Sequence, residues 1–168
     1  MGVDSDIAKI IEQEETLVFE RFNEAVAFAL GNRLRERALK DGLGIIIDIR
    51  TFDRPLFYAA LPGSSAANED WARRKINALR HYLKSSYRLA LEKKHESGVI
   101  EPREGLTPLD HVFAGGAFPI RVASAGIVGA VAVSGLPQRQ DHSVVVDALC
   151  DHLGFDRSRL ALPDEAST

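Results

Sequence analysis

Apolar residues recur every three or four positions in four segments of the chain, and this spacing predicts helices. The clearest helix begins after Asn23, a good N-cap residue, and ends at Gly42, because glycine readily adopts the left-handed conformation. Its expected apolar face comprises Val26, Leu30, Leu34 and Ala38. The other helices are expected over residues 5–15, over residues 69–94 with a division at Ser85-Ser86, and around residues 145–153.

Runs of apolar and β-branched residues, bounded by glycine or proline, predict strands between these helices. Four of the runs form two pairs with short connections, GLGIIIDIR with PLFYAAL and AFPIRV with IVGAVAV. A short connection permits only antiparallel pairing, because a parallel pair needs a long crossover. With a further short strand near residues 17–19, we expect an α/β (α+β) protein with a central five-stranded antiparallel sheet flanked by helices.

A chain of 168 residues is long enough for one domain with its own apolar core. We expect that single domain to span residues 1–155. Residues 156–168 are expected to be a weakly ordered C-terminal tail, since little chain remains after the last helix to hold them.

Composition and charge exclude several classes of partner. The net charge is −3, and no motif with interleaved aromatic and basic residues points to a nucleic acid. No apolar run approaches the roughly 20 residues of a membrane helix, and the acidic N-terminus is unlike a secretory signal. The single cysteine, Cys150, excludes an internal disulfide. We expect a soluble cytoplasmic protein with neither a nucleic-acid nor a membrane partner.

The stretch SGLPQRQDH brings Ser134, Asp141 and His142 together near the start of the last helix. A serine hydrolase elbow would need glycine two residues before and two residues after the serine, where this chain has alanine and leucine. Asp141 and His142 are also adjacent on a helix, so their side chains point in different directions. The pattern therefore favours the joint between a strand and a helix, with His142 still a candidate for a pocket.

Two other segments could contribute to a ligand site. Gly115 and Gly116, which come after His111, would let a backbone approach a ligand closely or would simply form a tight turn. Residues 69–94 carry a charge of +5, and there Trp71 precedes Arg74 and Lys75. An aromatic residue beside two cations is typical of an anion site or an interface, although a basic run is more often a solvated helix face. The five histidines form no HxH or HExxH pattern, so we expect no metal site.

Five segments together carry a resemblance to a known family: IIIDIR, LPGSSAANEDWARRK, KSSYR, GGAFPIRV and GAVAVSGLPQRQDH. The chain resembles the haem-degrading-domain superfamily (GlcG/HbpS-like), and within it an uncharacterised branch with WxxRK, GGxFPI and SGLPQxxDH motifs. The resemblance implies a profilin-like layer fold, homo-oligomers and, in some members, haem binding. The candidate ligand-binding positions that it implies are Trp71, Arg74, Lys75, Ser85, Ser86, His111, Gly115, Gly116, Phe118, Ser134, Asp141 and His142.

The sequence leaves three functional hypotheses open. The first is an oligomeric binding protein for haem or another small anionic metabolite. The second is a non-catalytic oligomeric module that binds other proteins through the basic helix and strand edges. The third is a haem-degrading enzyme, or an acid–base catalyst that uses His111 or His142. No pair of residues has a spacing that catalysis demands, so no catalytic residue, axial ligand or cofactor is assigned.

Overall fold

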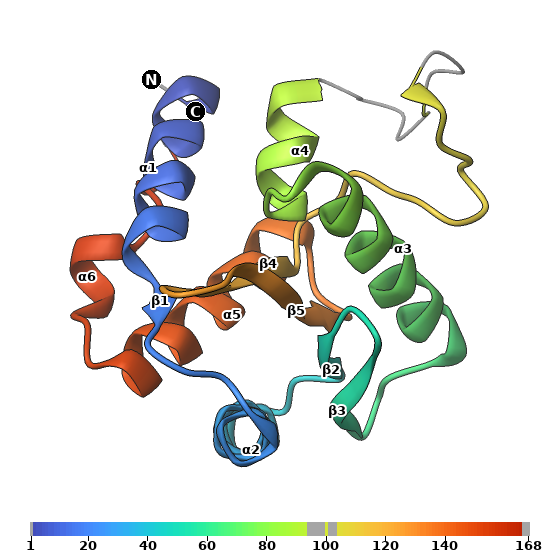
Figure 1. The fold of residues 1–168 in the computed structure, drawn as a ribbon. Helices are drawn as coiled ribbons and strands as arrows, with labels where there is room; N and C mark the ends of the chain where they lie inside the picture. The colour runs from blue at the N-terminus through green and yellow to red at the C-terminus, as the bar shows by residue number, and fades with distance from the viewer. Residues whose placement is uncertain (1, 94–99, 101–103, 166–168) are drawn as a thin grey trace.

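The structure is a computed structural model that describes residues 2–93, 100 and 104–165 (Figure 1). Two expectations extend outside the described residues: the 69–94 helix at residue 94, and the C-terminal tail at residues 166–168. The helices are α1 (Val3–Thr16), α2 (Glu24–Asp41), α3 (Ala66–Tyr82), α4 (Ser86–Lys93), α5 (Gln138–Leu153) and α6 (Arg157–Leu160). The strands are β1 (Val18–Phe19), β2 (Ile46–Thr51), β3 (Arg54–Ala60), β4 (Ala117–Val122) and β5 (Gly126–Ser134).

The five strands form one sheet in the order β1-β4-β5-β2-β3. Both expected hairpins are present, because β2 pairs antiparallel with β3 and β4 pairs antiparallel with β5. The expectation of a purely antiparallel sheet is wrong, because β1 pairs parallel with β4. No short connection constrains β1, because α2, β2, β3, α3 and α4 lie between it and β4 in the chain, so β1 can enter the sheet in either direction.

Helices cover both faces of the sheet and place the apolar core between the layers (Figure 1). The larger core lies on the side of α2 and α5, where strand residues such as Ile47, Phe118 and Val131 are fully buried. A smaller cluster joins Ile76 and Leu79 of α3 to small alanine residues of β4 and β5 on the other face. Alanine on that face lets α3 approach the strands closely. No helix among the described residues combines the length and the apolar character needed to span a membrane.

The expected 69–94 helix is divided close to Ser85-Ser86. Leu83 has a φ of 56°, the left-handed conformation that ends α3, and α4 begins at Ser86. The buried Glu14 of α1 accepts a hydrogen bond from the backbone N–H of Ser85 at 2.8 Å and also pairs with Arg88 at 2.7 Å. Glu14 therefore satisfies a free N–H group at the start of α4 and joins α1 to α4.

The segment expected to be a weakly ordered tail packs against the domain over its described part. Asp156 caps the short helix α6, and Leu160 is fully buried in the larger core. Gln13 donates a hydrogen bond to the carbonyl of Leu160 at 2.7 Å, and Lys9 donates to that of Arg159 at 3.1 Å. Helix α1 thus supplies the surface on which α6 lies, a contact between distant segments that the pattern after α5 does not indicate.

Candidate functional site

A buried ion pair lies at the end of the sheet where β5 leads into α5. Lys75 of α3 donates through Nζ to Asp141 of α5 at 2.9 Å and to the carbonyl of Val133 at 3.2 Å. Asp141 also accepts a hydrogen bond from the backbone N–H of Leu136 at 3.0 Å. The two side chains are 4% and 1% exposed. The pair therefore holds α3, the end of β5 and the start of α5 together across the edge of the core.

Burial sets the electrostatics of this pair. It lowers the pKa of Lys75, and Asp141 opposes that effect. Burial likewise raises the pKa of Asp141, again against the effect of its partner. Each group would therefore be difficult to keep charged without the other, because an isolated buried charge loses its hydration. The Nζ group of Lys75 is directed into the protein and is not available to a ligand in solution.

The paired glycines serve this same buried region. Gly116 has a φ of 137°, and a Cβ there would lie 2.8 Å from Lys75 Nζ and 2.3 Å from the carbonyl oxygen of Val133. A Cβ at Gly115 would lie 2.4 Å from the carbonyl oxygen of Gln138, whose side chain accepts a hydrogen bond from the Gly115 N–H at 3.1 Å. The glycines thus permit close packing of protein against protein, which supports the tight-turn interpretation.

His142 is fully inside the protein. Its Nε2 lies 2.8 Å from Oε1 of Gln13, and the Gln13 amide nitrogen donates to Leu160. Oε1 can then only accept, so Nε2 carries the proton and Nδ1 is unprotonated. Nδ1 is buried and has no hydrogen-bond partner in the described part of the chain. Burial lowers the pKa of His142 to about 3, so this imidazole, in a residue only 1% exposed, is neutral at pH 7.

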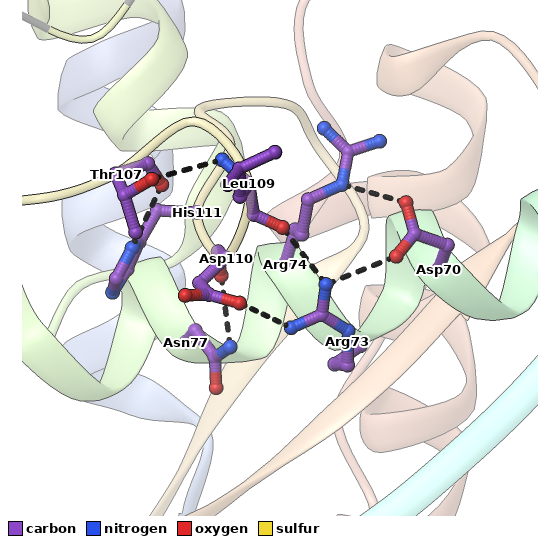
Figure 2. Close-up of polar contacts among 8 residues, drawn as sticks. All are labelled: Asp70, Arg73, Arg74, Asn77, Thr107, Leu109, Asp110 and His111. Carbon is purple, nitrogen blue, oxygen red and sulfur yellow. Dashed lines mark hydrogen bonds and ion pairs between the residues drawn. The ribbon is translucent and has the colours of Figure 1, made fainter.

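A different arrangement lies on the exposed side of α3. The guanidinium of Arg74 lies 4.6 Å from the centre of the Trp71 ring, and the Trp71 side chain is 40% exposed. Asp70 accepts a hydrogen bond from Arg74 Nε at 2.9 Å, which fixes the guanidinium over the ring. Figure 2 shows the two terminal nitrogens of Arg74 directed away from Asp70, and they have no partner among the residues described. This Trp71–Arg74 surface offers free cationic donors beside an aromatic face.

The segment before Gly115 is attached to the same helix (Figure 2). Arg73 reaches Asp110 at 3.0 Å and the carbonyl of Leu109 at 2.9 Å, and Asn77 donates to the carbonyl of Asp110 at 2.8 Å. The Leu109 side chain is left 79% exposed. His111 holds its Nδ1 3.1 Å from the carbonyl of Thr107, and its ring points away from Arg74 in Figure 2.

The structure therefore divides the predicted site residues into two groups. Trp71 and Arg74 are together on the outside of α3, and His111 lies nearby but turns away. The remaining residues lie inside the protein: Lys75, Ser85, Ser86, Gly115, Gly116, Phe118, Ser134, Asp141 and His142. Among these, Ser86 Oγ accepts a hydrogen bond from the Ala117 N–H at 2.9 Å, and the Phe118 ring lies 5.9 Å from that of His142. Their contacts support the fold.

Two surface grooves lie elsewhere. One, of about 550 Å³, runs between α5 and residues 161–165, and the other, of about 320 Å³, lies between α2, α5 and Arg157. No predicted site residue lines either groove. Arg139, in the larger groove, is already bound to Asp6 and to the carbonyl of Pro163. The described residues contain no cluster of three or more His, Cys, Asp or Glu side chains placed to hold a metal ion.

Comparison with known proteins places the chain in a family. The family model described as "Haem degrading protein HbpS-like" matches residues 22–150. The chain belongs to this HbpS-like family. The resemblance drawn from the five sequence segments is thereby confirmed at the level of the family.

Relatives of this HbpS-like chain carry the name UPF0303. This chain is 57% identical over 166 residues to a UPF0303 protein of Mesorhizobium japonicum, with 99% of each chain covered. It is 52% identical to a UPF0303 protein of Brucella canis, covering 94% of this chain and 93% of the relative. Neither name describes an activity.

Solved structures share the fold at lower identity. The crystal structure of the Ybr137w protein has a TM-score of 0.82 at 22% identity and covers 90% of this HbpS-like chain and 92% of its own. The structure of HbpS has a TM-score of 0.62 at 19% identity, and the match covers 80% of this chain and 91% of HbpS. The PduOC:Heme complex has a TM-score of 0.63 at 16% identity, and the match covers 79% of this chain and 94% of the PduOC chain. These likenesses confirm the expected profilin-like layer fold.

The family description raises the question of whether the residues of this HbpS-like chain fit a haem. Arg74 has two free nitrogens suited to a propionate, and the Trp71 ring suits the flat macrocycle. Neither histidine near these elements is placed to ligate the iron, because His111 turns away from Trp71 and Arg74, and His142 is buried with its Nε2 bonded to Gln13. The Trp71–Arg74 surface thus fits the edge of a haem, and no axial ligand is assigned.

Two features of the site were not predicted from the sequence. Lys75 and Asp141 are separate candidates there, although Lys75 lies on the same helix face as the apolar residues Ala72, Ile76 and Leu79, where a buried partner is expected. A lone lysine within an apolar stripe indicates a buried counter-charge. Asp70, which fixes Arg74, is the second such feature, although its spacing of four residues from Arg74 on a helix is typical of an ion pair.

Proposed function

We propose that this protein binds a small anionic ligand with a flat apolar body, and that haem is the first ligand to test. The Trp71–Arg74 surface is the observation that carries the proposal. An arginine fixed over an exposed tryptophan loses little freedom on binding, so its two free nitrogens are pre-organised for a carboxylate. The family description and the haem complex of the distant PduOC structure support haem as the candidate.

In this proposal each residue has a defined part. Arg74 neutralises a carboxylate of the ligand, Trp71 covers one face of its apolar body, and Asp70 positions Arg74. The exposed Leu109, held near α3 through Arg73, adds apolar surface at the margin. When bound, haem would supply its own redox chemistry, and the residues named here would hold its edge.

Haem titration followed by the Soret absorption band tests the proposal. Arg74→Gln removes the charged donor and is expected to weaken binding about 5- to 30-fold, equivalent to about 1–2 kcal/mol for one ion pair with a partly buried arginine. Arg35→Gln is the control, because Arg35 is an exposed arginine on α2 and the substitution makes the same change in net charge. Equal affinities in the two variants would contradict the proposal.

Iron-free protoporphyrin IX separates binding by the edge from ligation of the metal. If Arg74 and Trp71 hold the ligand, the iron-free porphyrin should bind within a few-fold of haem, as measured by fluorescence quenching. A porphyrin that binds only with its iron would instead require an axial ligand, and would show that the Trp71–Arg74 surface is not the main site.

A further inference from the structure

Strand β3 is an edge of the sheet whose outer side has no partner among the described residues. Its one strand neighbour there is β2, and Figure 1 shows β3 at the border of the sheet. An open edge presents backbone N–H and C=O groups that are free to pair with another strand. Aromatic side chains flank the edge, because Tyr58 is 47% exposed and Phe28 of α2, 63% exposed, lies 6.2 Å from the Phe57 ring.

Soluble proteins usually protect such an edge with charges, proline or a bulge. In β3 these protective features occur only in the first half of the strand. Arg54 is its only charged residue, Pro55 comes next, and the register with β2 shifts between Phe57 and Pro55. The remaining residues, from Phe57 to Ala60, are uncharged and pair regularly with β2. This half of the edge is therefore open to a further strand.

The residues at 57–59, FYA, are complementary to their own reverse and lie within the regular half of the edge. In an antiparallel pair centred on Tyr58, Phe57 of one strand faces Ala59 of the other, and the two Tyr58 rings meet. Each large side chain then lies opposite a small one, and the central aromatic pair is a favourable cross-strand contact. We propose that β3 pairs antiparallel with β3 of a second copy of this chain, about a twofold axis at Tyr58.

Charge also favours this arrangement. The antiparallel pair places the two Arg54 side chains at opposite ends, about 26 Å apart for eight residues of strand. A parallel pair would place them side by side, where like charges repel. Two sheets joined in this way form one continuous sheet of ten strands across a twofold axis, and the same patch serves on both copies.

A cysteine at the axis tests the geometry directly. Tyr58→Cys places two thiols opposite one another, where directly paired residues have Cβ atoms about 4.5–5.5 Å apart, close enough for a disulfide after a small adjustment. The native Cys150 does not interfere, because it is buried and burial raises the pKa of its thiol to about 11. Under mild oxidation Tyr58→Cys should form a covalent dimer at least tenfold faster than Arg35→Cys, an exposed control on α2. Equal rates would overturn the proposal.

Mass in solution, by light scattering after size-exclusion chromatography, gives an independent test that needs no ligand. Tyr58→Lys brings two like charges to the axis and should halve the mass of the assembly, while Tyr58→Thr, uncharged and favourable in a strand, should leave it unchanged. Circular dichroism should show both variants folded, since Tyr58 is exposed. A monomeric wild-type protein, or an assembly that Tyr58→Lys leaves intact, would refute pairing through β3.

Discussion

Removing one member of the Lys75–Asp141 pair should be far more damaging than removing both. Lys75→Met leaves the carboxylate of Asp141, 1% exposed, without a counter-charge. Breaking a buried pair in this way costs about 3–5 kcal/mol, whereas replacing both charges by neutral groups is often close to neutral. Asp141→Asn is expected to cost a similar amount, since it leaves the ammonium group of Lys75 buried and unpaired.

The double variant separates the interaction energy of Lys75 with Asp141 from the energies of their contacts with other residues. In Lys75→Met/Asp141→Asn no buried charge remains, and the Asn side-chain oxygen can still accept from the Leu136 N–H. The free energy of unfolding should therefore fall by less than in either single variant, with a coupling of at least about 2 kcal/mol. Urea unfolding followed by circular dichroism measures all four proteins of the cycle.

The exposed pair of Arg54 and Glu24 is the matched control. Their atoms lie 2.7 Å apart, but the side chains are 53% and 70% exposed, so water screens the interaction. A cycle with Arg54→Met and Glu24→Gln should show almost no coupling. If the losses for Lys75 and Asp141 simply add, as they would for two independent sites, the assigned role of the buried pair is wrong.

Further variants test other contacts by the same unfolding measurement. Burial lowers the pKa of His142 to about 3, so below pH 6.5 the unfolded chain binds a proton that the folded chain does not bind. This group should cost about 2 kcal/mol of stability between pH 7.5 and 5, and His142→Gln should reduce the acid-induced loss by about that amount. Part of the loss should remain, because burial also lowers the pKa of His152, and a loss equal to that of the wild type would contradict the burial of His142. Glu14→Ala should cost about 2–3 kcal/mol because it leaves the Ser85 N–H and Arg88 without their buried acceptor, and a loss no larger than that of Glu15→Ala would refute this. Gly129→Ala should cost at least about 2 kcal/mol, since its Cβ would meet the Arg50 carbonyl oxygen at 1.9 Å, and an unchanged urea midpoint would refute the close packing of β2 on β5.

Local pattern predicted the helices and hairpins, whereas contacts between distant segments were beyond it. The Ile-rich strand β2 and its partner β3 could be predicted from composition and a short connection. The parallel pairing of β1 with β4 and the burial of Leu160 against the core depend on segments far apart in the chain, and no local signal encodes them. The family resemblance located the important stretches, but it could not separate residues that face a ligand from residues that hold the fold.

The stretch WARRK shows why that separation needs coordinates. Arg74 and Lys75 are neighbours in sequence, but successive residues on a helix point about 100° apart. The Arg74 side chain therefore lies over Trp71 at the outer side of α3, 18% exposed, and the Lys75 side chain reaches 66 residues along the chain to Asp141. Substitutions at these two adjacent positions should then separate function from stability: Arg74→Gln should weaken binding of an anionic ligand with little change in unfolding, and Lys75→Met should unfold the protein more easily. If instead both variants change the same property, α3 does not carry two independent roles on its two faces.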